Sequence, residues 1–114
     1  MKQILQQWFD RNGSVPGVLA FAVQYPDQTN STQKCAPNIT AEALDNAWRC
    51  VIETIPVLAM NNFPTARVRW VYEGGIVHCE RRRDGLCLAI FTTKEASSFN
   101  PQELDRLLAE FHAL

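Results

Sequence analysis

The chain has 114 residues, and its charges nearly cancel, with 11 Lys and Arg against 12 Asp and Glu and a formal net charge of -1. At about 150 residues per domain, this length has room for one hydrophobic core, so we predict a single domain over residues 1–114. Nucleic-acid binders gather a surplus of basic residues on one face, and this charge balance argues against a nucleic-acid partner.

Membrane insertion, secretion and metal binding all lack a signal in the sequence. The longest uncharged apolar stretch, Val15 to Tyr25, is far shorter than the roughly 20 residues that cross a bilayer as a helix. The N-terminus has no continuous apolar segment of the secretory type, which favours a cytoplasmic location. We therefore expect thiols without zinc-type spacing, and no metal, at Cys35, Cys50, Cys79 and Cys87.

Helical and strand patterns alternate along the first half of the chain. Apolar residues at helical spacing predict a helix from Lys2 to Arg11, and the apolar run Gly17 to Tyr25 predicts a strand covered on both faces. A polar turn leads to a weakly patterned edge strand around Ser31 to Ala36. Thr40 can cap a long second helix, in which Pro56 predicts either a kink or a new start.

The second half predicts three strands and a closing helix. Gly74-Gly75 and Asp84-Gly85 divide the strands, which are Ala66 to Tyr72, Ile76 to Arg82 and Leu86 to Thr92. A capping sequence at Asn100 predicts the last helix, which runs to Phe111. The order α-β-β-α-β-β-β-α predicts an α/β fold of the α+β type, with one five-stranded antiparallel sheet and helices on both faces.

Two-residue loops in both late hairpins would place Trp70 opposite Cys79, Arg69 opposite Glu80, and Cys79 opposite Ile90. One face then collects apolar residues that helices must cover, namely Val68, Trp70, Val77, Cys79, Leu88 and Ile90. The other face carries Arg67, Arg69, His78, Glu80, Arg82, Ala89 and Phe91.

The predicted elements do not bring any candidate catalytic side chains together. His78 and Cys79 are adjacent on a strand, so their side chains diverge, and we interpret the cysteine as core and the histidine as surface. His112 lies in the last turn of the closing helix, where nothing nearby offers a metal ligand. The sequence also lacks a phosphate loop, a nucleophile elbow and paired carboxylates, which favours a binding module over an enzyme.

Basic residues concentrate at Arg81-Arg82-Arg83, together with Arg67 and Arg69. A phosphate or an acidic protein is one interpretation of this cluster. Nearby Glu73 and Glu80 offset part of its charge, and a solvated strand end is the favoured interpretation.

Nearly the whole chain resembles the roadblock domain family, which is named after a dynein light chain and shares its architecture with longin and profilin-like domains. The resemblance lies in Val15-Pro16-Gly17-Val18 before the first strand, in Gly75 to Ile90 across the last hairpin, and in Leu104 to Leu108 of the closing helix.

This resemblance implies a non-catalytic, homodimeric adaptor or regulator without a cofactor, which binds a small Ras-like GTPase or a larger assembly. Family members dimerise through the third strand and the long helix. The interface implied here consists of Arg67, Val68, Arg69, Trp70 and Val71 on the strand and of Trp48, Val51 and Ile55 on the helix.

Two other functional classes suit a domain of this kind. Profilin-like and PAS-like sheets hold small molecules against one face, so a small-molecule sensor is the first alternative. A secretion-type chaperone of similar size is the second.

Overall fold

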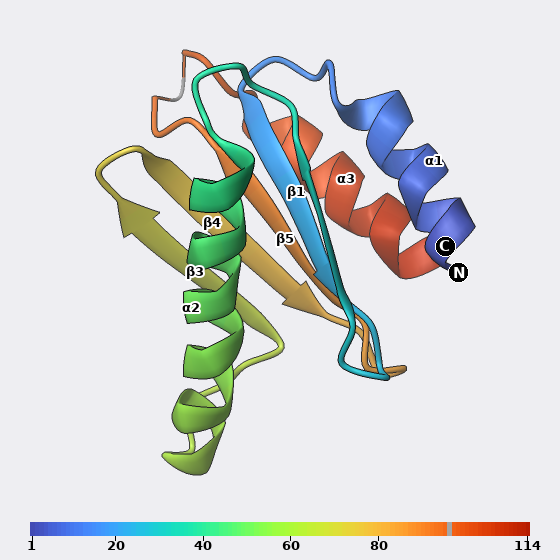
Figure 1. The fold of residues 1–114 in the computed structure, drawn as a ribbon, viewed down its shortest axis with the longest axis vertical. Coiled ribbons are helices and arrows are strands. Elements are labelled where there is room, and N and C mark those ends of the chain that lie inside the picture. The colour runs from blue at the N-terminus through green and yellow to red at the C-terminus, as the bar shows by residue number, and fades with distance from the viewer. Residues whose placement is uncertain (96) are drawn as a thin grey trace.

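A computed structural model describes residues 1–95 and 97–114 and contains three helices and five strands (Figure 1). The helices are α1 (Lys2–Asn12), α2 (Ala41–Met60) and α3 (Pro101–Ala113). The strands are β1 (Val18–Gln24), β2 (Asn30–Lys34), β3 (Arg67–Tyr72), β4 (Gly75–Arg81) and β5 (Cys87–Thr92).

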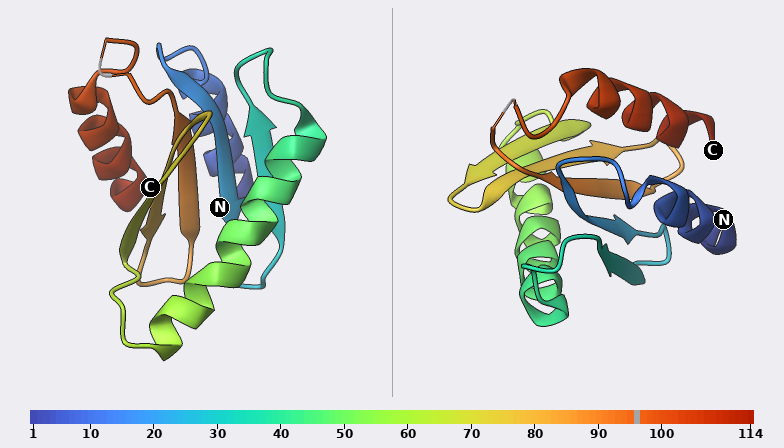
Figure 2. Two further views of the ribbon diagram at one scale, coloured as in Figure 1. Left: turned by 90° about the vertical axis from the view of Figure 1, so that its left-hand side faces the viewer. Right: turned by 90° about the horizontal axis from the view of Figure 1, so that it is seen from above.

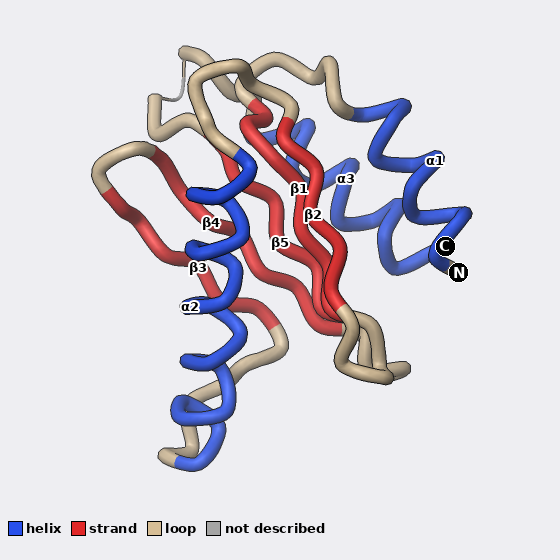
Figure 3. The backbone as a smooth tube through the Cα atoms, in the orientation of Figure 1, coloured by secondary structure: helices blue, strands red, loops and turns tan. Residues whose placement is uncertain are grey.

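The five strands form one antiparallel sheet in the order β2-β1-β5-β4-β3. Helix α2 covers one face of this sheet, while α1 and α3 cover the other (Figures 2 and 3). The predicted fold class, element order and strand number are confirmed.

Each face of the sheet has its own hydrophobic core. Under α1 and α3 the core is built from large side chains, among them Trp8, Phe9, Phe21 and Phe111. Rings of Phe9 and Phe21 stack at 4.9 Å between centroids. On the α2 face the sheet presents small residues, which let the helix lie close to the strands, and these are Ala20, Ala22 and Ala89.

Local sequence signals explain where the long helices begin. The Thr40 hydroxyl accepts a hydrogen bond from the Ala43 amide at 3.0 Å, and the Asn100 side chain accepts one from the Gln102 amide at the same distance. Helix α2 continues through Pro56, which excludes the new start that the sequence offered as one alternative. Since that proline is exposed, its ring projects into solvent rather than into the core.

Both late hairpins differ from the predicted register. The β3–β4 turn is Glu73-Gly74, so Trp70 pairs with Val77, while Val68 takes the position opposite Cys79. The β4–β5 loop has three residues, Arg83 to Gly85, closed by the Arg82 amide donating to the Leu86 carbonyl at 2.8 Å. Gly85 has a φ of 94°, which suits a three-residue loop with a left-handed position.

The extra loop residue reverses the two faces of β5. Leu88 and Ile90 point toward α1 and α3, whereas Cys87, Ala89 and Phe91 point toward α2. The prediction that Leu88 and Ile90 share a face with Trp70 was therefore wrong, because a one-residue change of register inverts every side chain of a strand. The face predicted to be polar is instead the floor of the larger core.

Candidate functional site

Strand β3 ends the sheet and has β4 as its one neighbour among the described residues. The Arg81 amide donates to the Ala66 carbonyl at 2.9 Å, and hydrogen-bonded pairs alternate along antiparallel strands. The backbone N–H and C=O groups of Val68 and Trp70 therefore face β4. Those that point away from the sheet belong to Arg67, Arg69 and Val71.

Side chains along this edge are compatible with pairing to another strand. The strand contains no proline, and Val71 is 64% exposed and Tyr72 38% exposed. Val68 and Trp70 are half-buried and lie on the α2 face. An edge with free backbone groups and exposed apolar side chains is a template for association.

An apolar groove of about 510 Å³ adjoins this edge on the α2 face. Trp70 and Tyr72 of β3 form one wall, and Ala43, Ala47 and Cys50 of α2 form the other. Val77 and Phe91 contribute from the sheet between them. The groove and the free edge together make a continuous surface.

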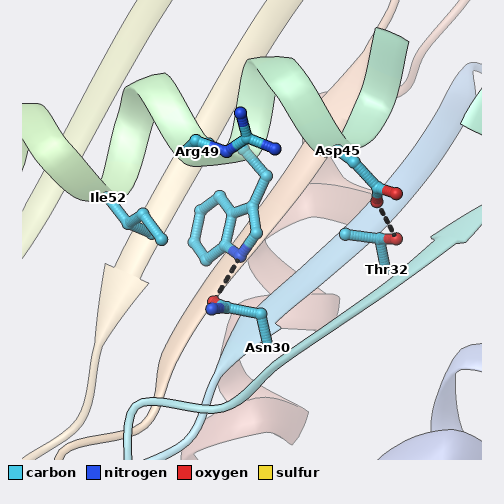
Figure 4. Close-up of a pocket in the computed structure, with 6 residues that line it drawn as sticks. Asn30, Thr32, Asp45, Arg49 and Ile52 are labelled. Carbon is cyan, nitrogen blue, oxygen red and sulfur yellow. Dashed lines mark hydrogen bonds between the residues drawn. The ribbon is translucent and has the colours of Figure 1, made fainter. Parts of the chain in front are cut away.

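Polar contacts to the far edge strand hold α2 in its place (Figure 4). The Trp48 indole N–H donates to Asn30 Oδ1 at 2.9 Å, and the Thr32 hydroxyl donates to Asp45 Oδ1 at 2.6 Å. Both contacts tie α2 to β2, the strand farthest from β3. Because the helix is anchored on that side, the apolar groove stays open on the β3 side.

The three α2 residues that the family resemblance implied for the dimer interface lie in the core beneath the helix. Trp48, Val51 and Ile55 are buried beneath α2, with exposed fractions of 2%, 9% and 5%. They attach the helix to its own sheet and leave little surface for a partner, and their part in an interface stays a prediction. Exposed apolar side chains on α2 occur near its C-terminal end, where Val57 is 55% and Met60 82% exposed.

Much of the basic cluster has structural partners. Arg67 donates twice to the Glu80 carboxylate, at 2.7 and 3.1 Å, and His112 Nε2 lies 2.8 Å from Glu80 Oε1. Burial by itself raises the pKa of the Glu80 carboxyl, but the hydrogen bonds from Arg67 and His112 outweigh burial and hold that pKa below its usual value. Sequence reasoning missed the His112 contact, since its partner is 32 residues away in the chain.

Arg82 ties the end of α3 to the last hairpin. Its guanidinium donates to the Phe111 carbonyl at 2.8 Å, lies over the Phe111 ring at 5.2 Å, and pairs with Asp84. A cation that hydrogen-bonds the final carbonyls of a helix stabilises that helix end. Arg81 and Arg83 are exposed on either side.

The adjacent pair His78 and Cys79 diverges as predicted, but the histidine is not a surface residue. It is half-buried against α3, and its Nε2 lies 3.0 Å from the Thr92 hydroxyl oxygen. Burial, aided by the charge of Arg69, lowers the pKa of His78 to about 4. Burial also raises the pKa of Cys79, and it raises that of Cys87 to about 11 against the opposing effect of Arg81. These groups are therefore neutral near pH 7.

Within residues 1–95 and 97–114, no group of His, Cys, Asp and Glu side chains is arranged to hold a metal ion. The described helices likewise include none with the length and apolar character needed to span a bilayer. The β3 edge and the apolar groove beside it form the candidate site.

Comparisons with known proteins add no further assignment. No protein-family model matches the chain, and no curated protein matches it.

Proposed function

We propose that the chain is a non-catalytic protein-binding module that pairs with a second copy through β3. As a homodimer it serves as an adaptor or regulator for a small Ras-like GTPase or a larger assembly, the role implied by its resemblance to roadblock domains. The observation that carries the proposal is the free β3 edge next to an open apolar groove.

Physical considerations favour a second copy as the occupant of this edge. Antiparallel pairing of two β3 strands about a two-fold axis satisfies the outward backbone groups of both copies and extends the sheet. It also brings the partner against the mouth of the apolar groove, where Trp70 and Tyr72 lie. Removing that apolar surface from water stabilises the pair.

The charges on β3 favour one register for this pairing. A register centred on Arg69 opposes the two copies of that arginine, and opposed like charges destabilise a strand pair. Shifting the centre to Trp70 places Arg69 opposite Val71 of the second copy and Arg67 opposite its Glu73. This register replaces a repulsion with an attraction and sets the two Trp70 side chains next to the axis.

The groove also favours the small-molecule sensor as a second candidate. Its volume of about 510 Å³ lies within the usual range for ligand sites, and its walls are apolar. A dye for apolar surface, anilinonaphthalene sulfonate, distinguishes the two functions. If a second copy covers the groove, the native protein binds little dye and a variant that cannot dimerise binds more. If the groove is a ligand site, the native protein binds the dye as well as the variant does.

The regulator function is tested with purified small GTPases from the same genome, loaded with GDP or with a non-hydrolysable GTP analogue. We expect the native dimer to bind at least one of them with a preference for one nucleotide state. The chain incubated with GTP alone should release no phosphate above the buffer rate. Sustained turnover by the chain itself would contradict the non-catalytic assignment.

A further inference from the structure

We propose that the C-terminal end of α2, with the loop after it, binds the surface of a membrane that contains anionic phospholipids. Residues 57–63 form this contact and are called the α2 end. In such binding a few apolar side chains enter the boundary between headgroups and acyl chains while the domain stays in water, so no membrane-spanning segment is involved. The β3 edge and the apolar groove take no part, and the proposal is separate from the dimer.

Apolar side chains gather at the surface of the α2 end. Met60 is the most exposed large apolar residue among the described residues, at 82%, and Phe63 and Val57 are 59% and 55% exposed. Exposing such side chains to water is unfavourable, and apolar groups that gather on a surface mark contact with a protein or a membrane.

The shape of the α2 end favours a membrane over another folded protein. In Figures 1 and 2 the last turns of α2 and the loop after them project beyond the ends of the strands. No residue from Thr54 to Ala66 carries a charge. A stable protein interface takes about 800 Å² from each partner, which is more than three side chains at the end of a helix supply. A bilayer interface accepts a projecting apolar end of this size.

Two arginines lie next to the α2 end. The Arg81 amide donates to the Ala66 carbonyl at 2.9 Å, and Arg81 lines a small cavity together with Pro56 of α2. Arg83 follows in the β4–β5 loop, and both arginines are exposed. Within the described residues, neither of them makes an ion pair.

The carboxylates in this part of the molecule have partners or lie farther away. Three of them form the ion pairs Glu80–Arg67, Asp84–Arg82 and Asp27–Lys2. Glu53 is the last acidic residue of α2, and at 1.5 Å per residue it precedes Met60 by about 10 Å along the helix. The unpaired charge next to the α2 end is therefore that of Arg81 and Arg83, which complements anionic headgroups.

Binding is measured by co-sedimentation of the native protein with vesicles of phosphatidylcholine alone and with vesicles that also contain phosphatidylserine. We expect saturable binding that is at least about tenfold tighter with phosphatidylserine, because two arginines face the anionic surface. Added salt should weaken it. Equal affinity for the two kinds of vesicle would overturn the proposal, as would the absence of binding to both.

Apolar contact is tested at Met60. Met60→Glu puts a charge at the α2 end and should weaken binding to phosphatidylserine vesicles at least about tenfold. Ile4→Glu is the matched control, because Ile4 is 48% exposed on α1, which covers the other face of the sheet. The control should bind like the native protein. Equal weakening by both variants would show that added negative charge alone decides binding, contrary to the proposal.

Insertion is observed directly with tryptophan at position 63 and lipids that carry bromine on their acyl chains, which quench tryptophan fluorescence within the bilayer. Phe63→Trp should be quenched more strongly than the native protein, whose three tryptophans are buried or half-buried. Ile4→Trp should show no added quenching. The same quenching in both variants would contradict insertion of the α2 end.

The role of the arginines is tested with two double variants. Arg81→Gln with Arg83→Gln should abolish the preference for phosphatidylserine, whereas Arg11→Gln with Arg49→Gln removes the same charge from exposed positions outside the α2 end and should retain it. An equal loss in the two double variants would argue against a local site. If Met60→Glu lowers the mass in light scattering and leaves vesicle binding unchanged, the α2 end is a contact between copies and the proposal is wrong.

Discussion

At the scale of single residues, Glu80 is a junction between the β3–β4 hairpin and the last turn of α3. Its carboxylate is 7% exposed and receives hydrogen bonds from Arg67 and His112. Glutamine at this position lacks the charge and replaces one of the two acceptor oxygens with an NH2 donor, so Arg67 and His112 cannot both keep their hydrogen bonds. We expect Glu80→Gln to lower the free energy of unfolding at pH 7 by about 1–3 kcal/mol, measured by urea denaturation.

The pH dependence of this stabilisation follows from the pKa of Glu80. Because that pKa is lower in the folded than in the unfolded chain, the stabilisation is complete above the usual carboxyl pKa and disappears as the pH falls through the lowered value. Native protein and Glu80→Gln should therefore converge in stability at acidic pH. Glu103→Gln, at an exposed ion pair, is the control and should cost less than about 1 kcal/mol. A Glu80→Gln deficit that persists at pH 2 would contradict this account.

Gly17 is a position where the backbone leaves no room for a side chain. Its φ is 87°, and an added Cβ would lie 2.4 Å from the Ser98 carbonyl oxygen and 2.6 Å from Phe99 Cβ. Gly17→Ala therefore has to displace the loop before α3, and we expect a loss of about 2–4 kcal/mol in the free energy of unfolding.

Gly13 is the matched control for that substitution. Its backbone is right-handed helical, and the nearest atom to an added Cβ would be the Phe9 carbonyl oxygen, at 3.3 Å. We expect Gly13→Ala to change stability by less than about 1 kcal/mol in the same denaturation experiment. Equal effects at the two glycines would show that close packing at Gly17 is unimportant.

At the scale of elements, the two edges of the sheet differ in what they offer a partner. Strand β2 is polar and is flanked by contacts to α1 and α2, whereas β3 is apolar in part and adjoins the groove. Proline substitutions compare them directly, because proline removes a backbone donor. At an outward-facing position it costs no hydrogen bond to the neighbouring strand.

Val71→Pro removes an outward N–H of β3 and should weaken self-association at least tenfold in analytical ultracentrifugation, with little change in the monomer fold. Lys34→Pro is the control on β2. The Tyr25 amide donates to the Thr29 carbonyl and the Cys35 amide to the Leu19 carbonyl, so by alternation the N–H of Lys34 points away from β1. This variant should leave association intact. Val68→Pro is unsuitable, because the N–H of Val68 faces β4. Equal weakening by Val71→Pro and Lys34→Pro would argue against the β3 interface.

Element positions were predictable from sequence because they depend on local signals. Thr40, Asn100 and Pro101 mark helix starts, and apolar periodicity separates helices from strands. The pairing across the last hairpin was not predictable, since Asp84-Gly85 is compatible with both a two-residue and a three-residue loop. That single residue decides whether Leu88 or Ala89 faces α2, and only packing against the helices selects between them.

At the scale of the whole molecule, the candidate site was predictable in part. The alternation of β3 predicted that Val68 and Trp70 share a helix-covered face, and in the structure that face lies under α2. The family resemblance implied Trp48, Val51 and Ile55 for the interface, and sequence alone could not show how deeply the sheet buries these side chains. A cavity near the start of α3 is lined by residues of β3, β4, β5 and α3, which are far apart in the chain, so no local sequence pattern predicts it.

The central claim is that two copies of this chain associate through β3. Size-exclusion chromatography with multi-angle light scattering at tens of micromolar measures it most directly. We expect a mass of about twice the 12.9 kDa of one chain. A mass of 12.9 kDa that persists as the concentration is raised would contradict the dimer and, with it, the proposed function as a roadblock-type regulator.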